Sequence, residues 1–279
     1  GFAAIVLFMP LTIFALARGN SATNHEGWAS PTVIACFAVA AAAFAFFIVT
    51  ELRNPTPLLQ IRLLGERNFG ISMGVLTLFA VGMLGGTYLL PLYMQRGLGY
   101  TALMAGSVFL PVGLIQGVLS AVSGYMTRYV KPLLPVVAGI LAMALSFWLA
   151  SRFTIHTSHR HILLVLYLRG FGMGLTFAPL NLFSLKNLTQ QDMAAAAGIS
   201  NSIKQLAGSF GIALLTVVFT ARTAFHAAHE TQQTPQTYVE GVTDALTVVV
   251  WITLTAALPL LGAIRRKKKP RNAGPKSLR

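Results

Sequence analysis

The sequence predicts an all-α, polytopic membrane protein with eight transmembrane helices. Of its 279 residues, 55% are hydrophobic and only 10% are charged, whereas charged residues make up about 25% of a typical soluble domain. The mean hydropathy is +0.68, and most of the chain falls into apolar runs of about 20 residues, the length that crosses a bilayer core. Both observations indicate that lipid surrounds most of the folded chain.

Eight apolar runs are separated by polar or charged connectors. The first run begins at Gly1 with neither a methionine nor the charged start of a signal peptide, so we expect a fragment of a longer protein that begins within a helix. The predicted spans are 1–17, 31–50, 70–93, 103–126, 132–150, 161–184, 199–221 and 243–264.

Lysine and arginine are unequally divided between the two sides of the predicted membrane domain. The positive-inside rule places the basic side in the cytoplasm, so both chain ends are expected there. The basic tail, 265–279, decides this orientation, and its net charge is a topology signal or a contact with anionic lipid rather than a nucleic-acid site. The inner segments carry Arg53, Arg62, Arg67, Arg128, Lys131, Lys186, Lys204 and the eight bases of 265–279, and the outer segments carry Arg18, Arg96, Arg152, Arg160 and Arg222.

The connector 51–69 mixes leucines with arginines and glutamates, and it is too short and too charged to cross a membrane. We expect it to lie along the cytoplasmic interface as an amphipathic segment. It divides a helix pair (1–50) from a six-helix unit (70–264), which the basic cytoplasmic tail (265–279) follows.

Four of the six later spans carry small or polar residues at helical spacing, so these faces meet either a cavity or a neighbouring helix. Small-residue stripes are more often packing seams than ligand surfaces. Glutamine is harder to explain in this way, because an amide in hydrocarbon needs a partner. The residues expected to line a substrate cavity are Tyr88, Gln116, Arg169, Thr176, Gln205 and Ser209.

Arg169 is the one charged residue within the stretch 165–177. At about 1.5 Å per residue it lies roughly 12 Å into its predicted span, near the middle of a bilayer core. It either extends along the helix to the outer interface or faces the bundle interior and holds a partner. The seven acidic residues all lie in connectors or at span ends, so we expect that partner to be substrate, water or a part of the protein beyond this chain.

The stretch 89–114 resembles a segment of the fourteen-helix drug:proton antiporters of the major facilitator superfamily. The matching residues are Pro91, Leu92, Tyr93, Gln95, Gly99, Tyr100, Ala102, Ala105, Gly106, Leu110 and Pro111. Three further stretches are similar to the same family in the same order: 27–31, 51–59 and 194–214.

The resemblance implies that the chain is the C-terminal six-helix half of such an antiporter, preceded by its two extra helices. It implies a proton-driven exporter of amphipathic or apolar compounds in the bacterial inner membrane, with no enzymatic activity and no cofactor beyond the proton gradient. Implied partners are an N-terminal six-helix half, drug-like substrates, membrane lipids and a periplasmic adaptor protein. Arg169 is similar to an arginine that the family links to proton coupling, although the adjoining Gln-Gly pair is absent.

The stretch 123–132 resembles the family's gating turn between two helices, with its aspartate and second glycine missing. Gly124, Arg128 and Lys131 remain, and they are the expected gating residues.

Two histidine groups remain to be explained, one at 156–161 and one at 226–230. Neither has a fixed metal-ligand spacing, so we predict no metal site and expect solvated loops. Two alternative functions stay open: a membrane-embedded enzyme that uses an outer histidine cluster, and an inert truncated product.

Overall fold

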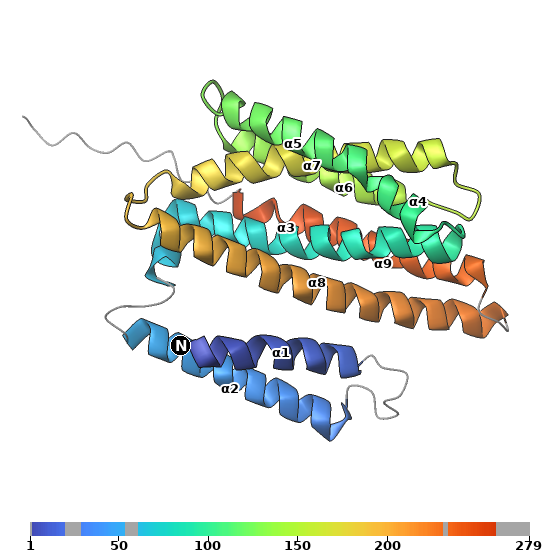
Figure 1. Ribbon diagram of the computed structural model, residues 1–279, viewed down its shortest axis with the longest axis horizontal. Helices are drawn as coiled ribbons and strands as arrows, with labels where there is room; N and C mark the ends of the chain where they lie inside the picture. Colours follow the sequence, from blue (N-terminus) through green and yellow to red (C-terminus); the bar gives the residue numbers. More distant parts are fainter. Residues whose placement is uncertain (1, 20–28, 54–60, 231–233, 261–279) are drawn as a thin grey trace, which may run out of the picture.

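The computed structural model describes residues 2–19, 29–53, 61–230 and 234–260, and this part of the chain is helical, with no strand (Figure 1). The predicted all-α class is therefore confirmed. The helices are α1 (Phe2–Gly19), α2 (Pro31–Arg53), α3 (Arg67–Leu92), α4 (Ala102–Ser107), α5 (Phe109–Met126), α6 (Leu133–Ala150), α7 (His159–Leu185), α8 (Met193–Glu230) and α9 (Pro235–Thr255), with a 3-10 turn at Ile61–Gly65 and a π turn at Tyr93–Gly97.

In the described part of the chain, six helical segments are long and apolar enough to cross a membrane. They are α3 with the π turn, α4 with α5, and α6, α7, α8 and α9, and they correspond to the last six predicted spans. The first two predicted spans are helical as well, as α1 and α2. Neither α1 nor α2 is among the six segments found in the described residues, so the membrane crossing of this pair stays a prediction.

The ends of two helices differ from the predicted spans. α8 begins at Met193 and ends at Glu230, and α9 begins at Pro235, whereas hydropathy predicted 199–221 and a start at 243. The added residues 222–230 of α8 and 235–242 of α9 include polar and charged side chains, the added residues 193–198 of α8 are mostly alanine, and the Thr234 side chain caps α9. Hydropathy detects the part of a helix that lies in lipid, so it misses helix that continues into the interface.

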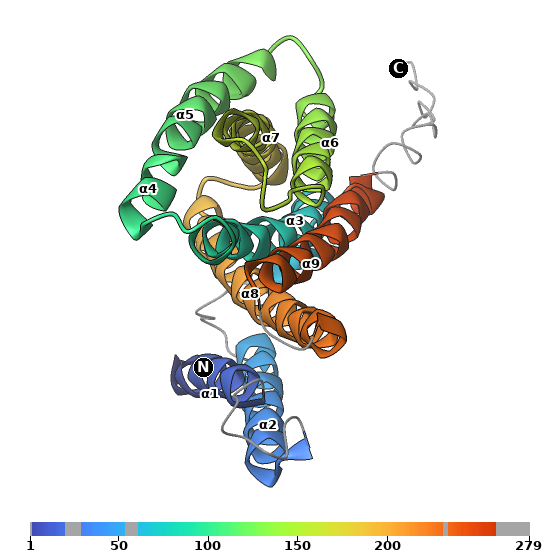
Figure 2. The same cartoon turned by 90° about the vertical axis from the view of Figure 1, so that its right-hand side faces the viewer.

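α3, α5 and α6 surround α7. Figure 2 shows α7 between α5 and α6, with α3 and α9 beside them and α8 beyond. α7 packs against α5, α6 and α3, while α3 packs against α8 and α9. α5 packs mainly on α7, continuing from α4, so much of its surface has no helix against it within the described chain.

Glycines bring the helix pairs into contact. A Cβ atom on Gly172 of α7 would lie 2.8 Å from the Gly139 carbonyl oxygen of α6. One on Gly174 would lie 2.9 Å from the Gln116 carbonyl oxygen of α5, and one on Gly85 of α3 would lie 3.0 Å from the Gly211 carbonyl oxygen of α8. The alternative that small-residue stripes are packing seams is therefore correct for these positions.

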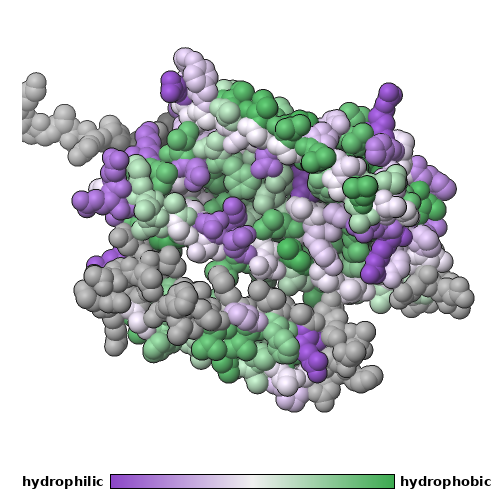
Figure 3. Space-filling model, viewed as in Figure 1, coloured by the Kyte–Doolittle hydropathy of each residue, from purple (hydrophilic) through white to green (hydrophobic). Residues whose placement is uncertain are grey.

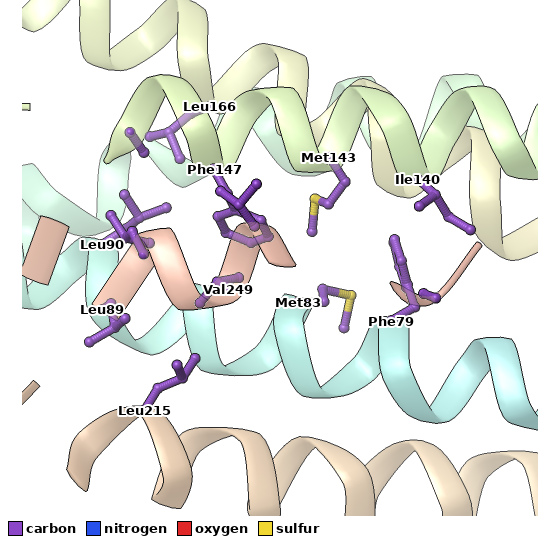
Figure 4. Close-up of a cluster of buried hydrophobic side chains, with 14 of the residues drawn as sticks. Phe79, Met83, Leu89, Leu90, Ile140, Met143, Phe147, Leu166, Leu215 and Val249 are labelled. Atoms are coloured by element: carbon purple, nitrogen blue, oxygen red, sulfur yellow. The ribbon is translucent and has the colours of Figure 1, made fainter. Parts of the chain in front are cut away.

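Large apolar side chains fill the space between these contacts. α3, α6, α7, α8 and α9 all contribute to one buried cluster (Figure 4). On the face shown in Figure 3, apolar residues cover much of the surface, and many of the hydrophilic residues lie toward its two ends. Side chains near the centre of the cluster include Phe79, Met83, Ile140, Met143, Phe147, Leu166, Leu215 and Val249.

The α1–α2 pair is placed as a separate unit beside the six-helix unit (Figure 1). α1 packs on α2 and contacts α8. The predicted connector 51–69 falls partly outside the described residues, because 54–60 are not described, and its remainder contains the turn Ile61–Gly65 and the start of α3. The predicted tail, 265–279, also lies outside them.

Candidate substrate-facing site

Arg169 is 2% exposed and lies ten residues after the first residue of α7, about 15 Å along its axis. Its Nη2 donates to the Met83 carbonyl oxygen at 3.0 Å and to Thr87 Oγ1, both on α3. The guanidinium also lies over the Phe147 ring of α6, 5.3 Å from the ring centroid. Arg169 therefore joins three helices inside the bundle.

This geometry decides between the two positions predicted for the Arg169 side chain. Extension along lipid to the outer interface is wrong, because the guanidinium lies inside the bundle against α3 and α6. The interior position is correct. The expected partner was substrate, water or a part of the protein beyond this chain, and that expectation is wrong for this conformation, because the partners are a carbonyl and a hydroxyl of α3 and a ring of α6. Nη1 is buried without a hydrogen-bond partner. In this conformation a molecule outside the bundle does not reach the guanidinium, so the predicted substrate contact of Arg169 stays untested.

Thr176 lies in a helix contact rather than against a cavity. It is fully buried, its Oγ1 donates to the Gly172 carbonyl oxygen of the same helix at 2.8 Å, and it faces Gly139 of α6. A threonine that bonds its own backbone needs no other partner. Its expected role in lining a cavity is therefore not supported by its position here.

α5 carries a small-residue face without a neighbour. Gly113 and Gly117 are exposed, and a Cβ atom added to either would meet nothing within 4 Å. Gln116 is half-buried beside this face. We call Gly113 and Gly117 the open face of α5. This face differs from the side of α5 that packs on α7, where Ser123 Oγ donates to the Gly174 carbonyl oxygen at 2.8 Å.

The remaining predicted cavity residues are spread over α3 and α8. Tyr88 of α3 is 40% exposed. On α8, Gln205 is exposed and Ser209 is half-buried. The six predicted residues therefore do not form one cluster: Arg169 and Thr176 lie inside the bundle, and the other four lie at its surface.

A pocket of about 190 Å³ opens between α3, α7 and α8. It lies near the ends of these helices where α3 and α8 begin and α7 finishes, which is the predicted cytoplasmic side. Sequence reasoning missed it, although Lys204 precedes the predicted Gln205 directly. The pocket is lined by Met73, Leu76, Phe177, Leu180, Asn181, Ser184, Ala197, Ser200, Asn201 and Lys204.

The outer histidines do not converge. His159 Nδ1 is 3.1 Å from the Tyr100 hydroxyl oxygen, while the His161 ring packs edge-on against Phe153. His226 lies on α8 between two carboxylates of α9, 3.3 Å from Glu240 and 3.0 Å from Asp244. No group of three or more His, Cys, Asp or Glu with metal-binding geometry occurs among the described residues.

Comparison with known proteins identifies the family. Residues 1–212 match the family model described as Major Facilitator Superfamily, which is more than half of the chain.

The chain belongs to the major facilitator superfamily.

Its relatives within the superfamily include proteins named for transport, export and resistance. Over 211 residues the chain is 30% identical to the uncharacterized MFS-type transporter YhcA of Bacillus subtilis, covering 76% of this chain and 40% of that protein. Over 233 residues it is 30% identical to the multidrug export protein EmrB of Escherichia coli, covering 83% and 45%. Over 201 residues it is 29% identical to the fatty acid resistance protein FarB of Neisseria gonorrhoeae, covering 72% and 40%. The chain thus spans less than half the length of these relatives.

One motif of the superfamily resemblance shapes the outer turn between α3 and α4. Tyr93 is 1% exposed, and its hydroxyl donates to the Thr154 carbonyl oxygen at 2.8 Å. Gly99 adopts a φ of 71°, which favours glycine, and the Thr101 side chain caps α4. These residues fix the turn in place rather than line a cavity.

The predicted gating residues surround the turn between α5 and α6. Gly124 lies close to α7, since an added Cβ would be 3.7 Å from Ala178. Arg128 and Lys131 are exposed, and the Arg128 guanidinium lies over the Tyr125 ring. Neither base forms an ion pair within the described residues, so their gating role stays a prediction.

Proposed function

We propose that the chain is the C-terminal part of a proton-driven multidrug exporter that carries amphipathic or apolar compounds across the bacterial inner membrane. Superfamily membership and the names of the relatives support export. The observation that carries the rest is the open face of α5, Gly113 and Gly117, which meets nothing in the described chain. Small residues placed this way suit a helix that borders a cavity or a second bundle.

In this proposal α3, α5 and α8 border the transport cavity, and an N-terminal six-helix half closes it from the other side. Substrate binds between the halves, and the halves rock about it. Tyr88, Gln116, Gln205 and Ser209 are the proposed contacts, because they remain at the surface of the six-helix unit. Arg169 and Thr176 lie inside the bundle, where α7 meets α3 and α6.

We assign the proton-coupling carboxylate to the N-terminal half. In the described part of the chain, Glu66 caps α3 and Asp192 accepts from Thr189 at 2.6 Å. Asp244 lies nine residues after the start of α9, farther inside a helix than hydropathy predicted. Its carboxylate contacts Arg222 and His226, each at 3.0 Å, so it already has two basic partners within this chain.

The test is ethidium export from cells that produce residues 1–279 with or without an N-terminal six-helix half from a relative. We expect export only when both parts are present, and we expect a protonophore to abolish it. Export by the chain alone would contradict the need for a second half. Export that survives the protonophore would contradict proton drive, and loss of export in Asp244→Asn with normal membrane levels would place the coupling group in this chain.

A further inference from the structure

We propose that His226 of α8, held between Glu240 and Asp244 of α9, is a proton-binding site that sets how firmly the two helices are joined. A proton on the ring completes the contact between α8 and α9, and loss of that proton opens the contact to Glu240. The site lies toward the predicted outer face of the membrane. The inference goes beyond the proposed export function and does not depend on it.

The two ring nitrogens of His226 face different carboxylates. Nδ1 lies 3.3 Å from Glu240 Oε2, and Nε2 lies 3.0 Å from Asp244 Oδ2. A neutral imidazole has one nitrogen that donates and one that accepts, so it donates to only one of these oxygens and turns a lone pair toward the other. A ring with a proton on each nitrogen donates to both. The geometry therefore suits the protonated ring.

A proton on His226 also balances the charges around it. Arg222 Nε lies 3.0 Å from Asp244 Oδ2, so with a neutral ring the four side chains hold one positive charge against two negative charges. With the proton, they hold two of each. The His226 side chain is 26% exposed, and charges that are partly removed from water interact more strongly than exposed ones.

The contact between α8 and α9 does not depend on the proton alone. Gly241 of α9 faces Thr223 of α8 so closely that an added Cβ atom would clash with Thr223 Oγ1. The ion pair between Arg222 and Asp244 is present in either charge state of the histidine. The proton therefore adds a second link beside one that is already in place.

Glu240 is positioned to form that second link. Gln236 Nε2 donates to Glu240 Oε1 at 3.1 Å, while Oε2 of the same carboxylate faces the His226 ring. When the ring loses the proton on the nitrogen that faces Glu240, a lone pair meets a negative oxygen, and the two groups move apart.

The other helices that pack on α8 bring further charged groups to this end of the molecule. Arg96, in the π turn that follows α3, lies over the Tyr238 ring of α9, 5.5 Å from its centroid. α1 also contacts α8 and carries the exposed Arg18 near its last residue. The side chains of His229 and Glu230 lie outside the described set.

The test is the distance between spin labels on α8 and α9 in the 279-residue chain in nanodiscs, measured by electron paramagnetic resonance. The labels are attached at Ala221→Cys and Thr247→Cys in a chain with Cys36→Ser, and both labelled positions are exposed. Spectra are recorded at about pH 5 and about pH 8, the interval over which histidine changes charge. We expect a longer and broader distance distribution at the higher pH.

Two substitutions fix the charge of residue 226 in opposite ways. His226→Gln takes up no proton and should give the longer distance at both pH values, whereas His226→Arg keeps its charge and should give the shorter distance at both. His156→Gln is the matched control, since His156 is exposed in the α6–α7 turn, and it should keep the pH response. A response that survives in His226→Gln, or its absence from the unsubstituted chain, would overturn the proposal.

A second variant covers a folding defect in the His226 substitutions. Glu240→Gln keeps the ring but removes the charge that faces Nδ1, so it should also lose the distance response. Because the second link is present at low pH and lost as the pH rises, the thermal unfolding midpoint of the unsubstituted chain should fall by about 2–4 °C more than that of Glu240→Gln between the two pH values. Equal falls would overturn the role of Glu240. Neither measurement uses export, so failure of the export proposal leaves both results standing.

Discussion

At the scale of single residues, Arg169 shows how a membrane protein can bury a cation without a buried acid. One terminal nitrogen reaches a helix carbonyl and a hydroxyl of α3, and the guanidinium lies against Phe147. Hydrogen bonds to a charged group contribute about 1.5–3 kcal/mol, while the effective cost of burying an ion is several kcal/mol. These opposing contributions nearly balance, so the arginine is not needed for stability.

We therefore expect Arg169→Met to insert, to fold with a thermal unfolding midpoint close to or above that of the unsubstituted chain, and to lose ethidium export in the assembled protein. Size-exclusion chromatography in detergent after heating measures the unfolding midpoint, and dye efflux from cells measures export. Phe171→Leu, on the exposed side of α7, is the matched control and should keep both properties. Normal export by Arg169→Met would show that the guanidinium has no part in transport.

At the scale of elements, glycines have two different roles that depend on which helix lies opposite. On α7, Gly172 lets the α6 backbone approach, since an added Cβ would lie 2.8 Å from both the Gly139 carbonyl oxygen and the Met143 nitrogen. On α5, Gly113 and Gly117 have nothing opposite them. The same residue type is therefore required by packing in one helix and left free in the other.

A pair of alanine substitutions separates these roles. Gly172→Ala should destabilise the chain by about 1–3 kcal/mol, because the helices must move apart to admit a methyl group. Gly113→Ala should be neutral or stabilising by about 0.5–1 kcal/mol, because alanine loses less conformational entropy in a helix. Thermal unfolding of both variants in the same detergent is the measurement. Equal destabilisation by the two changes would contradict the absence of a neighbouring helix at Gly113.

At the scale of the whole molecule, orientation in the membrane follows from the distribution of basic residues and not from the packing. It is tested by removing Cys36, the single cysteine, and introducing one cysteine at a time into intact cells. A membrane-impermeant maleimide should label Ile155→Cys, in the α6–α7 turn, and should not label Tyr129→Cys, in the α5–α6 turn. Both original side chains are exposed, by 37% and 75%, so the position expected to stay unlabelled is the more accessible of the two within the protein. Reversed labelling would place the C-terminus outside.

The sequence predicts the helices well and their partners poorly. Apolar length alone located α3 to α9, because hydrophobicity determines which segments enter lipid. The break between α4 and α5 and the π turn at Tyr93–Gly97 were not predicted, since neither alters hydropathy. Periodicity placed Thr176 and Gly172 on one face of α7, but whether that face met a cavity or α6 depended on the tertiary contact. The pocket was missed for the same reason, because its lining comes from three helices that are distant in the chain.

α8 connects the two ends of the molecule as one continuous rod of 38 residues. Lys204 lies in the pocket near one end, and Arg222 contacts Asp244 of α9 near the other, about 27 Å apart along the helix. Because α8 is one continuous helix, a change in its tilt at the pocket would also change its position against α9, at the opposite membrane face.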